Sequence, residues 1–322
     1  MNGFGRFGLH MLKYWLDRGI SSNFVIQYIN DDFLSAEKIY SIILKDEAVI
    51  FNKYKVTCFE NIITFTEPSG ETYSIKCSNL PKKDIPWLGK PDMVFECSGK
   101  STSKKDCKQY IKGSTKCVLI SATSWDADAT LVFGFNHKDY NSSHEIISYG
   151  SCTVNAYVPL ANYINNQYGI EDSDVNVIHN IQSHRLDENY TLIRKFCTLE
   201  KSGQNLLKCI NKDNFAVNYT VIPYPGVSMI DFRFRVKRTP TKKELINDFE
   251  LSCADGELKG LYGIDEVDIG PEIYNCTTFS SAIIKENIRL NGDNIYLPAY
   301  FDNENSVNRY YDLAQYLSSQ LS

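Results

Sequence analysis

The sequence predicts a two-domain α/β protein, in which a doubly wound parallel sheet is followed by an α+β region with a mostly antiparallel sheet. In the first half, apolar strand-like segments alternate with helical segments and end in small residues, the pattern of a doubly wound sheet. A glycine-rich turn opens the first predicted helix, over residues 9–16. In the second half, residues 227–237 alternate in part between apolar and polar, which indicates a long half-buried strand.

The composition narrows the class of protein. With 322 residues the chain is long enough for two domains, and 43% hydrophobic and 23% charged residues are ordinary for a globular protein. A net charge of -5 argues against nucleic-acid binding, and no apolar run approaches the roughly 18 residues of a membrane span. The ten cysteines contain no CxxC pair, so neither a metal site nor a redox motif is predicted. Scattered thiols indicate a reducing cytoplasm.

The N-terminal stretch has the pattern of a dinucleotide-binding turn. Gly3, Gly5 and Gly8 form a GxGxxG motif at the start of a helix, where a pyrophosphate can approach the backbone and the helix N-terminus. Residues 24–31 then form an apolar stretch that ends in Asp31, the expected acceptor for the adenosine ribose hydroxyls. Because Asp31 would repel a 2′-phosphate, we expect NAD rather than NADP, although a loop aspartate can follow any strand.

One element of this pattern is missing. A dinucleotide fold needs a central strand before its glycine turn, yet only Met1 and Asn2 precede Gly3. Either the true start lies upstream, which we favour, or the chain has lost the strand. Losing it would expose the hydrogen-bonding edges of both neighbouring strands.

Two further predicted strands end near this site, at Ser98 and at Ser121. Small residues at the carboxyl end of a strand let a cofactor pass close to the backbone. We place the NAD-binding domain at residues 1–151, completed by a C-terminal helix over 304–322. The catalytic domain takes residues 152–303, with a predicted helix from 241 to about 251.

A cysteine and a histidine are the candidate catalytic pair. Cys152 follows an apolar strand and Gly150 and opens a helix, where the helix N-terminus stabilises a thiolate. His179 follows 27 residues later in a second apolar strand. Such a pair is sufficient for nucleophilic attack on a carbonyl, but an arbitrary cysteine is more often a buried apolar residue, and spacing alone does not show that the two meet.

The motifs taken together resemble glyceraldehyde-3-phosphate dehydrogenase. They occur in the family's order along nearly the whole chain: Asn2–Gly8 (NGFGRFG), Ile29–Asp31, Glu96–Gly99, Ile120–Ala122, Ser151–Asn155 (SCTVN), Val227–Asp231 and Tyr300–Glu304. The resemblance implies a Rossmann-type NAD-binding domain, an α+β catalytic domain and a homotetramer.

The resemblance also implies residue roles. Cys152 would attack an aldehyde, His179 would handle protons, and phosphate or water would release the resulting thioester. Asn303 would hold the nicotinamide, and the rest of the implied cofactor shell is Gly3, Phe4, Gly5, Arg6, Phe7, Asp31, Ser98 and Ser121. Ser151 and Thr153 would contact inorganic phosphate.

Several phosphate ligands of the family are absent. Gln182 and His184 stand in place of two threonines, and Val221 and Glu200 align with two phosphate-binding arginines. The family's Ser-Thr-Gly loop, expected after residues 205–207, is missing. The polar candidates for a rebuilt pocket are Gln182, His184, Arg185, Arg194 and Arg233, each of which can equally be a solvated or subunit-interface side chain.

Two functional hypotheses follow. The first is an NAD-dependent oxidation of a small, phosphorylated or otherwise anionic aldehyde through a Cys152 thioester. The second is a catalytically weak paralogue that binds NAD in a binding or regulatory role, which the missing phosphate ligands favour. Retention of both Cys152 and His179 counts against the second hypothesis.

Overall fold

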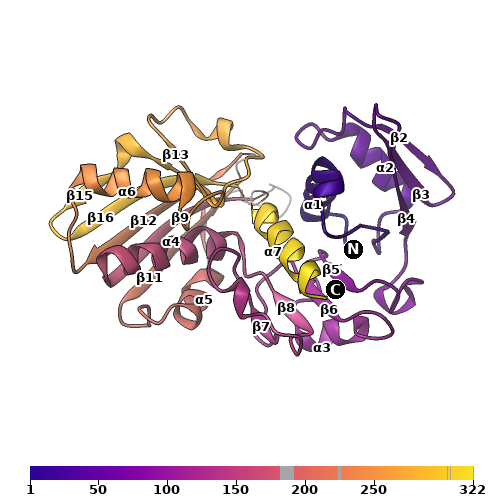
Figure 1. Ribbon diagram of the computed structural model, residues 1–322, viewed down its shortest axis with the longest axis horizontal. Helices are drawn as coiled ribbons and strands as arrows, with labels where there is room; N and C mark the ends of the chain where they lie inside the picture. Colours follow the sequence, from indigo (N-terminus) through magenta and orange to yellow (C-terminus); the bar gives the residue numbers. More distant parts are fainter. Residues whose placement is uncertain (182–191, 224–225, 303, 305, 322) are drawn as a thin grey trace. The chain divides into compact units, whose positions relative to one another are not determined.

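The chain divides into two compact units (Figure 1). The computed structural model describes residues 1–181, 192–223, 226–302, 304 and 306–321. Unit 1 consists of Met1–Leu131, Asn136–Gly150 and Tyr310–Ser322. Unit 2 consists of Val132–Phe135 and Ser151–Arg309.

Unit 1 alternates strands and helices as the sequence predicts. Its elements are α1 (Arg6–Arg18), β1 (Tyr28–Asn30), α2 (Ala36–Lys45), β2 (Lys55–Phe59), β3 (Ile62–Thr66), β4 (Thr72–Ser78), β5 (Met93–Glu96), α3 (Lys104–Cys107), β6 (Cys117–Ile120), β7 (Ala129–Thr130) and β8 (Ile146–Ser148). The strand expected over 24–31 is shorter than its apolar run, because β1 pairs with β4 over only three residues.

The strands of unit 1 form two groups of four, in the orders β1-β4-β3-β2 and β5-β6-β8-β7. The second group is parallel throughout. In the first group β1 and β4 are parallel, while β2, β3 and β4 form an antiparallel meander. The parallel sheet of the predicted fold class is therefore confirmed.

Asn2 lies at the position that the central strand of the predicted fold would take. Asn2 forms parallel bridges to Asn30, at the end of β1, and to Glu96, at the end of β5. Its N–H donates to the Phe95 carbonyl (2.8 Å), and its carbonyl accepts from Cys97 N–H (2.7 Å). The Asn2 side chain donates to the buried Glu96 carboxylate at 2.9 Å, and Tyr110 donates to the same carboxylate at 2.6 Å. These donors offset the cost of burying a charge.

Unit 2 contains the longer strands and helices. Its elements are α4 (Cys152–Tyr168), β9 (Ile170–Asn180), β10 (Ile193–Arg194), α5 (Thr198–Leu206), β11 (Phe215–Ile222), β12 (Ser228–Val236), α6 (Lys242–Asp255), β13 (Tyr262–Asp265), β14 (Ser281–Ile284), β15 (Arg289–Asn291) and β16 (Asn294–Phe301). The last helix, α7 (Ser306–Leu321), begins in unit 2 and continues in unit 1.

The strands of unit 2 form one sheet in the order β10-β11-β9-β12-β16-β14-β13, with β15 beside β16. Most neighbours are antiparallel, whereas β9/β11 and β13/β14 are parallel. The core lies on one face, where alternate residues of β9 and β12, such as Val177 and Phe232, pack with Tyr157 of α4 and Phe249 of α6. The predicted mostly antiparallel sheet is confirmed.

Capping residues explain why several helix starts were predictable. The Ser35 hydroxyl accepts from Lys38 N–H before α2, and Thr241 forms a reciprocal capping box with Glu244 before α6. These side chains satisfy backbone donors that a helix start leaves open.

No helix in the described part of the chain has the length and apolar character needed to cross a membrane. The same residues contain no cluster of three His, Cys, Asp or Glu side chains placed to hold a metal ion.

Candidate functional site

Cys152 is the first residue of α4, and a cap fixes its position. Gly150 turns the chain after β8 with φ +88°, a left-handed conformation that favours glycine. Ser151 is the N-cap, and its hydroxyl accepts from Val154 N–H at 3.3 Å. The Asn155 side chain donates to the Ser151 carbonyl at 3.0 Å. The Cys152 thiol is therefore held at a helix N-terminus.

The structure brings Cys152 and His179 together. The Cys152 Sγ lies 3.5 Å from Nε2 of His179, which is buried at the end of β9. The other ring nitrogen, Nδ1, lies 2.7 Å from the Asn180 carbonyl oxygen. Because a carbonyl only accepts, Nδ1 carries the hydrogen, and in the neutral ring Nε2 is left as the acceptor that faces the thiol.

Burial and the helix N-terminus act on this thiol in opposite directions. Burial raises the pKa of Cys152 to about 12, whereas the N–H groups of Cys152 and Thr153 lower this pKa by a smaller amount. The thiolate stabilisation expected from the helix N-terminus is thus outweighed by desolvation. With this pKa the Cys152 side chain is a thiol at neutral pH. Forming the thiolate therefore requires transfer of the thiol proton to a base such as His179.

A second helix N-terminus lies beside the first. The helix α5 begins at Thr198, whose hydroxyl donates to the Ser151 hydroxyl at 3.3 Å. The N-cap of α5 is Cys197, whose Sγ lies 3.5 Å from the Thr153 hydroxyl. Hydroxyls from Ser151, Thr153 and Thr198 thus gather where two helices begin, and helix N-termini favour anions.

The sequence did not single out Thr198. The family's hydroxyl-rich loop is expected after residues 205–207, but that stretch ends the helix that Thr198 begins. The N-cap of this helix is Cys197, which forms no side-chain capping bond, so the usual Ser, Thr, Asp or Asn signal of a helix start is lacking at that position.

The glycine turn of unit 1 is closely packed at two of its three glycines. Gly3 has φ +92°, and a Cβ there would lie 2.5 Å from the Ser98 backbone. A Cβ on Gly8 would lie 2.4 Å from the Gly3 carbonyl oxygen. At Gly5, the N-cap of α1, no atom lies within 4 Å of a Cβ position, and no side chain caps the helix. Open space at an uncapped helix N-terminus fits a pyrophosphate.

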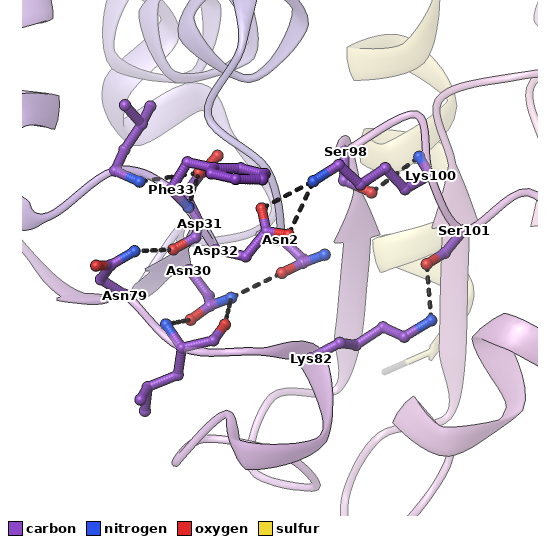
Figure 2. Close-up of polar contacts among 12 residues, drawn as sticks. Asn2, Asn30, Asp31, Asp32, Phe33, Asn79, Lys82, Ser98, Lys100 and Ser101 are labelled. Carbon is purple, nitrogen blue, oxygen red and sulfur yellow. Dashed lines mark hydrogen bonds and ion pairs between the residues drawn. The ribbon is translucent and has the colours of Figure 1, made fainter.

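Asp31 ties the loop after β1 to the glycine turn. Its carboxylate accepts from Phe4 N–H at 2.8 Å. Within the loop it also accepts from Phe33 N–H at 2.9 Å and from Leu34 N–H at 3.1 Å (Figure 2). A carboxylate has about four lone-pair positions, so one position remains for a ribose hydroxyl.

A cavity of about 270 Å³ adjoins the glycine turn. This volume is near the lower end of ligand pockets and fits part of a nucleotide. The lining residues, several of them visible in Figure 2, are Asn2, Gly3, Asn30, Asp32, Lys82, Ser98, Lys100, Ser101 and Asp106.

Comparison with known proteins finds relatives that match nearly the whole chain. The chain is 29% identical to "Glyceraldehyde-3-phosphate dehydrogenase 2" of Trichormus variabilis, over 99% of this chain and 98% of that protein. It is 28% identical to "Glyceraldehyde-3-phosphate dehydrogenase 1" of Bacillus cereus and 29% identical to the enzyme of Streptomyces coelicolor, each covered to 98%. The chain resembles the glyceraldehyde-3-phosphate dehydrogenases. The resemblance inferred from the motifs is thereby confirmed, and the identities are consistent with a divergent member. No family model matches the chain.

The other residues of the cofactor shell implied by the glyceraldehyde-3-phosphate dehydrogenase resemblance have different surroundings. Arg6 pairs with Asp46, and the Phe7 ring packs edge-on against Tyr310, with centroids 5.0 Å apart. Ser98 N–H donates to the Glu96 carboxylate at 2.9 Å. Ser121 follows β6, and its N–H donates to the Glu96 carbonyl at 3.0 Å.

The substrate-pocket candidates divide into three groups. Arg233 binds Asp172 (2.7 Å) and Asp174 on the sheet face opposite His179, so the structure argues against it as a phosphate ligand. Arg194 is exposed on the edge strand β10, opposite Thr220 of β11. Gln182, His184 and Arg185 lie outside the described residues, as does Asn303 of the implied cofactor shell.

Proposed function

We propose that this chain is an NAD-dependent dehydrogenase that oxidises a small phosphorylated or otherwise anionic aldehyde through a covalent Cys152 intermediate. The observation that carries the proposal is the 3.5 Å contact between Cys152 Sγ and the acceptor nitrogen of His179 at the start of α4. The similarity to glyceraldehyde-3-phosphate dehydrogenases supports the substrate class. The open helix N-terminus at Gly5 supports the cofactor class.

The proposed chemistry begins with a proton transfer from the Cys152 thiol to His179 Nε2. The thiolate adds to the aldehyde carbon, and the imidazolium gives its proton to the oxygen that becomes negative, which forms the thiohemiacetal and restores neutral His179. His179 accepts the hydroxyl proton of the thiohemiacetal as its hydride leaves, which gives a Cys152 thioester. Bound NAD would supply the hydride acceptor. Attack by inorganic phosphate or water on the thioester returns the thiol.

The three hydroxyls beside Cys152 are the proposed anion site. Ser151, Thr153 and Thr198 can donate to phosphate oxygens, and the N-termini of α4 and α5 add favourable dipoles. Among the described residues no arginine forms a hydrogen bond with these three hydroxyls, so these residues would bind phosphate without the bidentate charge-assisted bonds that arginine provides. We therefore expect weak phosphate binding.

A catalytically weak, NAD-binding paralogue is the second candidate. The observations that favour it are the Cys152 pKa, which burial raises to about 12, and the engagement of Arg233 by carboxylates on the other sheet face. In this case the cofactor site is used for binding or regulation, and the Cys152–His179 pair turns over slowly.

The assembly proposed from the resemblance is a homotetramer. Sedimentation velocity of the purified chain tests this assignment, because a monomer and a tetramer differ fourfold in mass.

The decisive assay is NADH formation from glyceraldehyde 3-phosphate, measured with and without inorganic phosphate. Rapid phosphate-dependent turnover is the result expected for the phosphorylating dehydrogenase. Turnover without a phosphate requirement would indicate hydrolytic release of the thioester. No turnover with this or other small aldehydes, from a chain that binds NAD, would contradict the proposal in favour of the second candidate.

A further inference from the structure

An ion pair joins two loops that border the 270 Å³ cavity of unit 1 (Figure 2). Asp32 lies in the loop after β1, and Lys100 lies in the loop after β5. The Lys100 Nζ is 2.8 Å and 3.1 Å from the two carboxylate oxygens of Asp32. Both side chains remain about half exposed, at 55% for Lys100 and 43% for Asp32. The pair is therefore accessible to a ligand that enters the cavity.

Further contacts hold Lys100 in this position. Its Nζ lies 4.1 Å from the centre of the Phe33 ring, a cation–π distance. Its backbone N–H donates to the Ser98 hydroxyl at 3.1 Å. The ammonium is thus fixed at the border of the cavity, where its charge is neutralised by Asp32.

A second ammonium lines the same cavity in a different environment. Lys82 Nζ donates to the Ser101 hydroxyl at 2.7 Å and to the Asp106 backbone carbonyl at 2.9 Å. Both of these acceptors are neutral oxygens. The cavity is therefore lined by two ammonium groups with different partners. Lys82 binds neutral oxygens, whereas Lys100 binds the Asp32 carboxylate.

Asp31 alone is a weak barrier to a phosphate at this position. Three backbone N–H groups already point at its carboxylate and offset part of its negative charge. Discrimination between a ribose hydroxyl and a ribose 2′-phosphate then depends on the other charges of the cavity. Of its two lysines, Lys100 is the one whose ammonium is paired with a carboxylate, that of Asp32.

We propose that Asp32 sets the preference for NAD over NADP by holding Lys100 in an ion pair, which withdraws the cation that would bind a 2′-phosphate. This inference rests on the proposed function, because it assumes that the cavity receives the adenosine part of a dinucleotide. An ammonium paired with a carboxylate presents little net charge to an incoming dianion. Removing the carboxylate leaves the Lys100 ammonium without its counter-charge, so that it can pair with the phosphate.

The test is the ratio of the dissociation constants of NADP and NAD, measured by calorimetry on the full chain. The variants are Asp32→Asn, which keeps the side-chain size, and the double variant Asp32→Asn with Lys100→Met. The matched control is Glu145→Gln, which removes the carboxylate of the exposed Lys108–Glu145 pair outside the cavity. We expect Asp32→Asn to lower the ratio of the NADP dissociation constant to the NAD dissociation constant about fivefold, by analogy with exposed charge contacts of about 1 kcal/mol.

Reversion and salt dependence complete the test. The double variant should return to the wild-type ratio, Glu145→Gln should match the wild type, and added salt should shrink the effect of Asp32→Asn. An unchanged ratio in Asp32→Asn, or a lowered ratio that persists in the double variant, would overturn the inference. Wild-type protein that binds neither dinucleotide would overturn this inference and the cofactor assignment together. Binding with the expected ratios but without aldehyde oxidation would remove only the proposed activity.

Discussion

The glycine turn of unit 1 and the Cys152–His179 pair of unit 2 are held in place by different physics. In the glycine turn, backbone atoms approach so closely that Gly3 and Gly8 admit no side chain. At the Cys152–His179 pair, two side chains from α4 and β9 meet through sheet and helix packing, and exchanging either one leaves the backbone unstrained. Changes at Gly3 or Gly8 should therefore act on folding, whereas changes to the pair should act on chemistry.

Two glycine variants give the largest expected difference. Gly3→Ala places a Cβ 2.5 Å from the Ser98 backbone at φ +92°, so we expect a loss of about 3 kcal/mol or more in the free energy of unfolding. Gly5→Ala enters open space at φ -74°, so its unfolding free energy should change by less than about 1 kcal/mol. Urea unfolding measures both, and equal losses would contradict the packing argument.

Gly5→Ala also probes the cofactor site without disturbing the fold. Its methyl group would occupy the space at the α1 N-terminus that we assign to the pyrophosphate. NAD affinity should therefore fall in this variant although its stability is retained, and unchanged affinity would place the pyrophosphate elsewhere.

His179→Asn should lower kcat/KM about 10²- to 10⁴-fold, because the variant loses the proton acceptor of Cys152. The dissociation constant of NAD and the unfolding free energy should change little. His137→Asn, a substitution in unit 1, is the matched control and should retain full activity.

The raised pKa of Cys152 predicts how the reactivity of this thiol depends on pH. Burial raises this pKa to about 12, so the thiolate fraction, and with it the alkylation rate by iodoacetamide, should keep rising from neutral into alkaline pH. A rate that reaches its plateau near neutral pH would mean that the thiolate is already formed in the resting protein.

Thr198→Val gives the smallest expected effect. Loss of one neutral hydroxyl donor is worth about 1 kcal/mol, so we expect the KM for inorganic phosphate to rise about fivefold with kcat little changed. Thr220→Val on β11 is the control, because Thr220 pairs with Ile178 on the sheet face away from His179. Equal effects of the two variants would remove the proposed role of Thr198.

The same contrast explains what could be read from the sequence. Local signals predicted the glycine turn and the starts of α2 and α6, since caps such as Ser35 and Thr241 act within four residues. Residues that meet through the fold were harder to foresee. Thr198 reaches Ser151 from 47 residues away, and Asn2 takes the central strand position only because Asn30 and Glu96 flank it.

The most direct test of the central claim is to trap the covalent intermediate. The protein is incubated with glyceraldehyde 3-phosphate and NAD in phosphate-free buffer, quenched in acid and digested for mass spectrometry. We predict that the peptide containing Cys152 gains the mass of the acyl group, and that His179→Asn accumulates it more slowly. NADH formation with the acyl group on another cysteine would contradict the assignment of Cys152 as the nucleophile.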